Sequence, residues 1–166
     1  MPTRSAEIIS AWAQNVPTLR IPQGDMMAIQ WAKELSVGNE IIDSEHRNLI
    51  GMVNSIEYAI GTKDSFALLG AIKLFKDEVD DHFANEARFA RAFNYHFEQH
   101  GLEHRHFQEE LQQKIDDLTV KIGVWPEYAM GHYPQLLRNW LIGHIACEDM
   151  KMKPVLQGYP CDFRPV

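Results

Sequence analysis

Four stretches of the chain carry metal-ligating side chains at spacings that let them share one site. These side chains are His46; His82 with Glu86; His100 with His104; and His144 with Asp149. The pairs 82/86 and 100/104 are each four residues apart, so their members lie about 40° apart around an ideal helix and point the same way. Imidazoles and carboxylates suit iron or a similar borderline ion. Five imidazoles with two carboxylates are too many for one tetrahedral zinc ion and favour a dinuclear site.

Helical periodicity on the same four stretches positions these residues. The stretches cover about 40–60, 64–93, 97–122 and 134–152. Apolar residues recur in them every three or four positions, and the candidate ligands fall on the apolar faces. Asp64 is a typical N-cap, Gly61 a plausible C-cap and Pro134 a favoured first helical residue, while Pro154 is expected to stop the last helix. Residues 123–133 are expected to form a loop with one helical turn at most.

Long amphipathic helices joined by short connections predict an all-α fold, an antiparallel up-and-down four-helix bundle. We expect residues 26–153 to form this bundle. Residues 1–25 are expected to form an N-terminal arm packed on the bundle, and residues 154–166, with three prolines, an irregular C-terminal tail. In an antiparallel bundle, ligands near the start of one helix lie beside ligands near the end of the next. All four ligand sets are therefore predicted to lie in one layer at one end.

The placement of polar side chains on core faces favours a metal site over ordinary core hydrogen bonding. A single buried histidine is most often a hydrogen-bonded core residue, and that explanation is the better one for any single member of the set. It does not account for the whole set, because the apolar faces of all four stretches are interrupted together, each time by a good metal ligand. Burying such groups is costly unless they are satisfied.

Composition excludes several other classes of function. The formal net charge of −7 argues against non-specific nucleic-acid binding and against anionic membrane surfaces. No apolar run approaches the roughly 18 residues of a membrane span, and the first residues do not resemble a secretion signal. The two cysteines, Cys147 and Cys161, imply no disulfide framework, so a cytoplasmic location is expected.

Four motifs carry a resemblance to a known family. They are IDSEHRNL (42–49), HFANE (82–86), HGLEHRHF (100–107) and WLIGHI (140–145) with Asp149. In order and spacing they resemble hemerythrin domains, especially bacterial ones, over about residues 29–153. The resemblance implies a non-haem di-iron centre that binds dioxygen reversibly, with two iron ions joined by an oxo or hydroxo bridge.

The resemblance also implies a role for each ligand. His100, His104 and His144 would hold a coordinatively saturated iron, His46 and His82 would hold the iron that keeps a position open for dioxygen, and Glu86 and Asp149 would bridge the two. The pocket is expected to be dry, because water and protons would release the bound oxygen. Leu49, Phe83, Leu141 and Ile145 fall near the ligands and could line it, which is compatible with plain core packing.

Two assignments stay open on spacing alone. His96 precedes His100 by four residues, so a 96/100 pair competes with the 100/104 pair, which the continuing apolar face and the family pattern favour. Glu148 lies four residues after His144, whereas Asp149 would lie about 140° away on an ideal helix. Spacing therefore prefers Glu148, and only the resemblance selects Asp149.

Two other functions remain possible for such a site. One is a di-iron redox enzyme that reduces peroxide or nitric oxide. The other is an oxygen-responsive or redox-responsive module that contacts a protein partner through the arm or the tail. A monomer is expected, because the apolar pattern leaves no spare face.

Overall fold

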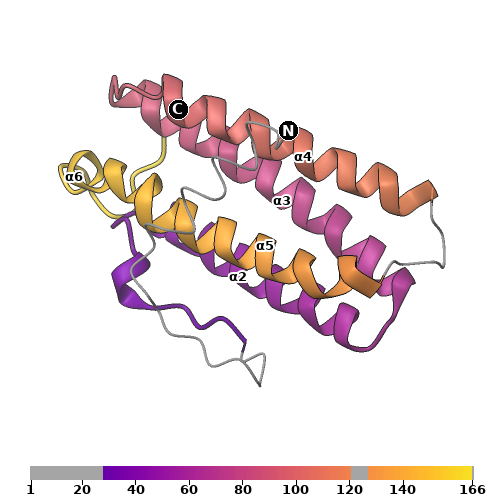
Figure 1. Cartoon of the computed structure of the whole chain (residues 1–166). Helices are drawn as coiled ribbons and strands as arrows, with labels where there is room; N and C mark the ends of the chain where they lie inside the picture. Colours follow the sequence, from indigo (N-terminus) through magenta and orange to yellow (C-terminus); the bar gives the residue numbers. More distant parts are fainter. Residues whose placement is uncertain (1–27, 121–126, 166) are drawn as a thin grey trace.

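Four long helices lie side by side and run alternately up and down (Figure 1). They are α2 (Glu40–Gly61), α3 (Ser65–Ala92), α4 (Glu98–Val120) and α5 (Glu127–Cys147). This computed structural model describes residues 28–120 and 127–165, and for 127–132 the backbone alone. A short 3-10 helix, η1 (Lys33–Leu35), precedes the bundle, and η2 (Asp149–Met152) and α6 (Lys153–Leu156) follow it. The predicted all-α four-helix bundle is confirmed, whereas the predicted arm lies outside the described residues.

Side-chain and backbone caps set the junction between α2 and α3. The carboxylate of Asp64 accepts hydrogen bonds from the backbone N–H groups of Phe66 and Ala67, which confirms Asp64 as the N-cap of α3. The prediction of Gly61 as the C-cap of α2 is wrong. The helix ends at Gly61 and its C-cap is Thr62, and Lys63 takes the left-handed conformation with φ 56°. The backbone closes there through hydrogen bonds from Lys63 and Asp64 back to the last turn of α2, so a glycine is not required.

The start and end of α5 differ from the sequence prediction. The helix begins at Glu127, so Pro134 lies inside it and residues 127–133 are helical rather than a loop. An interior proline removes one backbone hydrogen bond and its ring crowds the preceding turn, but α5 continues through Pro134. The α-helix ends at Cys147, and the chain continues as η2. Pro154 does not end a helix but sits in the first turn of α6, where no N–H donor is needed.

The apolar faces of the four helices meet in the larger of two clusters of buried apolar side chains in the described residues. It includes the four residues predicted to lie near the ligands, which are at most 5% exposed: Leu49, Phe83, Leu141 and Ile145. A buried ion pair, which the sequence did not reveal, also links α2 to α5. The guanidinium of Arg138 contacts both carboxylate oxygens of Glu57, with Nε 2.8 Å from Oε1. Two-point contact of this kind fixes the relative placement of the two helices. None of the helices in the described part of the chain is both long and apolar enough to cross a membrane.

The C-terminal tail packs on the end of the bundle where α2 begins and α3 ends. After α6 the described residues form turns and bends. The ring of Phe163 contacts Phe89 and Phe93 at the end of α3. The side chain of Asn39, the N-cap of α2, donates to the backbone carbonyl of Phe163 over 3.1 Å, and the backbone N–H of Glu40 donates to the carbonyl of residue 161 over 2.8 Å. The tail is therefore part of the folded unit in the described residues.

Replacing Phe163 with alanine is expected to lower the free energy of unfolding by about 2 kcal/mol, less than the roughly 3–5 kcal/mol typical of a fully buried phenylalanine, because the ring is half-buried. Urea unfolding followed by circular dichroism measures this. Phe66→Ala is the control, since Phe66 is 90% exposed and its loss should change stability by less than about 0.5 kcal/mol. Equal midpoints for both variants would show that the tail contributes nothing to stability.

Candidate metal centre

The seven side chains predicted as ligands meet at one end of the bundle and are all buried, between 0% and 5% exposed. They come from every long helix and from η2: His46 on α2, His82 and Glu86 on α3, His100 and His104 on α4, His144 on α5, and Asp149 on η2. This is the single layer that the antiparallel register predicts. The structure thus brings together all seven residues, and their role as metal ligands remains a proposal.

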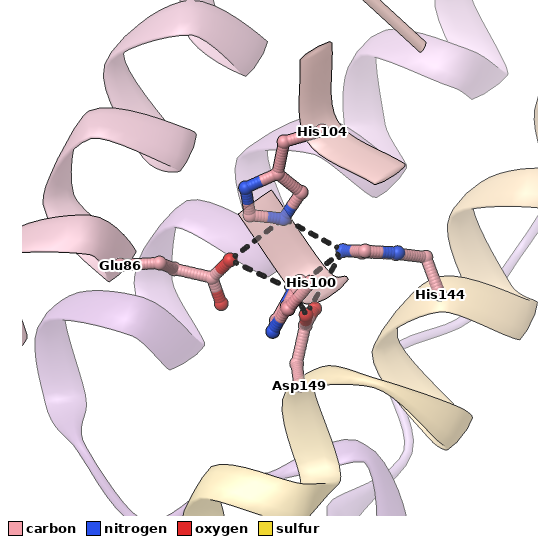
Figure 2. A group of neighbouring side chains, drawn as sticks. All are labelled: Glu86, His100, His104, His144 and Asp149. Atoms are coloured by element: carbon pink, nitrogen blue, oxygen red, sulfur yellow. Dashed lines mark hydrogen bonds and ion pairs between the residues drawn. The ribbon is translucent and has the colours of Figure 1, made fainter. Parts of the chain in front are cut away.

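Three imidazoles and two carboxylates form the first of two ligand groups (Figure 2). The Nε2 atom of His144 lies 2.9 Å from Nε2 of His104 and 3.1 Å from Nε2 of His100. Oδ1 of Asp149 is 3.1 Å from Nε2 of both His100 and His144, and Oε2 of Glu86 is 3.2 Å from Nε2 of His104. Neighbouring ligands about 2.1 Å from an octahedral ion lie about 3.0 Å apart. These distances therefore match donors arranged around one cation.

A second group shares the two carboxylates with the first and adds His46 and His82. Nε2 of His46 lies 3.1 Å from Oδ2 of Asp149, and Nε2 of His82 lies 3.7 Å from Oε1 of Glu86. Each carboxylate thus directs one oxygen to each group. This is the arrangement that a carboxylate bridging two metal ions requires. The first group offers five donors and the second offers four.

Several polar atoms of the cluster are buried without a hydrogen-bond partner among the described residues. They are both ring nitrogens of His46 and both carboxylate oxygens of Glu86 and of Asp149. Such atoms cost free energy unless something compensates them. Divalent cations would supply that compensation for the carboxylate oxygens and for Nε2 of His46. The donor set therefore fits two metal ions and fits poorly with a simple polar core.

Burial and mutual charge keep most of the cluster in a state suited to metal binding. Burial lowers the pKa of His46, and burial together with the neighbouring imidazoles lowers that of His104, so both rings are neutral at neutral pH. Burial raises the pKa of Glu86 well above its usual range, and the negative Asp149 raises it further. Burial would also raise the pKa of Asp149, but His144 and the other rings around it hold it well below its usual range. Glu86 therefore holds its proton up to a higher pH than an ordinary carboxyl group does, and a metal ion would have to displace that proton.

Residues around the cluster hold the rings in place; the sequence analysis named Phe83 among them but assigned no role to Trp140 or Glu45. Phe83 stacks on the ring of His104 with 3.5 Å between the ring centroids, and Trp140 stacks on the ring of His144 with 4.7 Å between the ring centroids. Nδ1 of His82 donates a hydrogen bond to Glu45 over 2.9 Å. Burial lowers the pKa of His82, but the carboxylates of Glu86 and Glu45 outweigh burial and raise it. The only signal for Glu45 in the sequence is its position directly before His46.

The structure answers the two questions that spacing left open. His96 is exposed and belongs to neither group, so the 96/100 pair is wrong. Glu148 forms an ion pair with Lys151 at 2.7 Å, whereas Asp149 joins the cluster. The ideal-helix projection misled at this point because α5 ends at Cys147 and the backbone changes to η2, which carries the Asp149 carboxylate inward.

Comparison with known proteins gives consistent results. The family model described as "Hemerythrin HHE cation binding domain" matches residues 37–156, which include α2 to η2 and α6. A bacteriohemerythrin from Pseudomonas aeruginosa (strain LESB58) is 24% identical over 124 residues, covering 75% of this chain and 78% of the relative. A bacteriohemerythrin from Pseudomonas paraeruginosa (strain DSM 24068 / PA7) is 24% identical with the same coverage. A third, from Stenotrophomonas maltophilia (strain R551-3), is 23% identical with the same coverage.

Proposed function

Because this chain belongs to the hemerythrin family, we propose that its buried cluster holds two non-haem iron ions and binds dioxygen reversibly. Two ferrous ions in this site would supply the two electrons that reversible oxygen binding uses. The observation that carries the proposal is the pair of ligand groups that share both carboxylates, Glu86 and Asp149. A mononuclear site would not need carboxylate oxygens directed to opposite sides.

The two ligand groups differ in their number of donors, which supports different roles for the two metal positions. His100, His104 and His144 with the two carboxylates provide five donors, which together with one bridging oxo or hydroxo group would complete an octahedral shell. His46 and His82 with the same carboxylates provide four donors, so that a bridging group leaves one position for dioxygen. We therefore assign oxygen binding to the side of His46 and His82.

Apolar residues around the cluster would keep water from the bound oxygen. Phe83 and Phe97 both contact the ring of His104, which is 3% exposed. We propose that Phe83 also lines the oxygen pocket together with Leu49, Leu141 and Ile145, all of them buried in the same core. A dry, low-dielectric wall limits the access of protons to the site.

The test is anaerobic loading with ferrous iron, followed by optical spectra before and after dioxygen is admitted and again under vacuum. We expect about two irons per chain and a visible band that appears with oxygen and disappears under vacuum. Fewer than two irons would overturn the dinuclear site. A permanent ferric spectrum with consumption of peroxide or nitric oxide would overturn reversible binding in favour of a redox enzyme.

Storage, delivery and sensing of oxygen use the same chemistry, and we propose the site without choosing among them. The cytoplasmic location, the monomeric state and a protein partner at the arm or tail remain predictions. Steady release of bound dioxygen when the loaded protein is diluted would favour storage or delivery. An oxygen-dependent change in partner binding that is lost when residues 1–25 are deleted would favour sensing.

A further inference from the structure

We propose that Glu45, held in place by Asn85, is a positioning residue that orients His82 and strengthens it as a metal ligand. This inference rests on the proposed function, since it concerns the side of the site assigned to oxygen binding. It adds a third carboxylate to the two that are shared between the ligand groups.

The ring of His82 is fixed from both sides. Its Nδ1 atom lies 2.9 Å from Oε2 of Glu45 on α2, and its Nε2 atom faces Oε1 of Glu86 at 3.7 Å. An ionised carboxylate only accepts hydrogen bonds, so Nδ1 carries a proton, and in the neutral ring Nε2 keeps its lone pair toward the cluster. That is the tautomer that a metal ligand needs. Glu45 thereby decides which nitrogen of His82 can bind metal.

Glu45 is itself fixed by α3. The side-chain amide of Asn85 donates to Oε1 of Glu45, while Oε2 accepts the hydrogen bond from Nδ1 of His82. The amide oxygen of Asn85 in turn accepts a hydrogen bond from Nη1 of Arg88 over 2.8 Å. The Glu45 side chain is 15% exposed and the His82 side chain 2%, so the network leads from the protein surface to the buried ring. Both oxygens of Glu45 are therefore engaged, and the carboxylate has little freedom to turn away.

The two histidines of the second group differ in this respect. Nδ1 of His46 is buried and has no hydrogen-bond partner in the part of the chain that the structure describes, whereas Nδ1 of His82 is hydrogen-bonded to a carboxylate. A carboxylate on the outer N–H makes an imidazole more basic and a better donor to a metal ion. The second group has one donor fewer than the first, so it depends more on the strength of each remaining donor. His82 is thus the anchoring ligand of the position assigned to oxygen.

Charge gives Glu45 a second effect. The two shared carboxylates offset only part of the charge of two divalent ions. A negative Glu45 next to His82 adds to that compensation and stabilises the more highly charged ferric state over the ferrous state. We expect its loss to weaken binding of the second metal ion and to raise the reduction potential of that position.

The first test uses Co²⁺ under anaerobic conditions, which probes metal binding without oxygen chemistry. Wild type and the variants Glu45→Gln, Glu45→Ala and Asn85→Ala are titrated and followed by visible absorption. We expect Glu45→Ala to lower the affinity for the second ion about 10-fold to 100-fold, while the affinity for the first ion changes little. Glu45→Gln keeps an acceptor oxygen but no charge and should fall between wild type and Glu45→Ala. Asn85→Ala should shift affinity the same way by a smaller factor.

The matched control is Glu110→Gln. Glu110, like Glu45, is paired with a histidine, because its Oε1 lies 3.7 Å from Nε2 of His106. That pair lies nearer the surface, since the side chain of Glu110 is 34% exposed and that of His106 is 46% exposed. We expect this variant to bind both ions as wild type does. A general effect of removing a glutamate next to a histidine would appear in the control as well.

The second readout is the exchangeable Nδ1 proton of His82 in the cobalt-loaded protein, seen as a shifted signal in proton NMR. It should move in Glu45→Gln and Asn85→Ala and stay in place in Glu110→Gln. A merely structural role would lower thermal stability without moving this signal. If wild type binds two ions and all Glu45 and Asn85 variants keep the second ion with unchanged affinity, the role of Glu45 is wrong while the proposed function stands. If wild type binds fewer than two ions, both proposals fail.

Discussion

Replacing Asp149 with asparagine is expected to lower the affinity for both metal ions by about 100-fold or more. Replacing the adjacent Glu148 with glutamine should leave both ions bound. Oδ1 of Asp149 lies 3.1 Å from Nε2 of His100 and of His144, and Oδ2 lies 3.1 Å from Nε2 of His46. Asparagine keeps the volume but loses the charge and one of the two oxygens. It cannot bridge two ions, so both ligand groups lose a donor or its charge.

The measurement is metal content per chain after anaerobic loading and gel filtration, with affinities from competition with a chelator. Glu148→Gln is a close control, because Glu148 is the neighbouring residue, 8% exposed and acidic, yet it pairs with Lys151 instead of the cluster. Two tightly bound ions in Asp149→Asn, or the loss of an ion in Glu148→Gln, would transfer the bridging role to the other residue.

The ligand layer could be predicted from the sequence because the local helical periodicity determines which residues are buried. His82 and Glu86 share a helical face with apolar neighbours, and so do His100 and His104, so their burial follows from the same three-and-four spacing that buries leucines. The up-and-down topology then places the start of one helix beside the end of the next. His46, near the start of α2, needs only this rule to meet His82 near the end of α3.

The remaining features depend on where a helix ends and on pairs far apart in the sequence. Asp149 enters the cluster because α5 stops at Cys147, and an ideal helix projected past that point favours the wrong carboxylate. Glu45 meets His82 across the boundary between α2 and α3, 37 residues away. Glu57 and Arg138, separated by 81 residues, form a buried ion pair that no local pattern indicates. Charged residues at such positions look like solvent-exposed ones in the sequence.

Removing the metal ions is expected to lower the free energy of unfolding by roughly 4 kcal/mol for each ion that had been present at about 1,000 times its dissociation constant. For a chain of this size, the loss of one such ion corresponds to a fall of about 10 °C in the unfolding temperature. The physical reason is the cluster itself, since both oxygens of Glu86 and of Asp149 are buried without hydrogen-bond partners in the described structure. A cation satisfies these atoms in the folded state and not in the unfolded chain.

Thermal unfolding with and without a chelator, monitored by circular dichroism, measures this effect. The shift should shrink as the pH falls from neutral, because burial and the charge of Asp149 raise the pKa of Glu86, and a metal ion must displace its proton. Ordinary carboxyl groups would begin to compete only at a lower pH. Asp149→Asn is the control, since its unfolding temperature should hardly respond to the chelator. A wild-type protein that carries two ions and unfolds at the same temperature without them would place those ions outside the buried cluster.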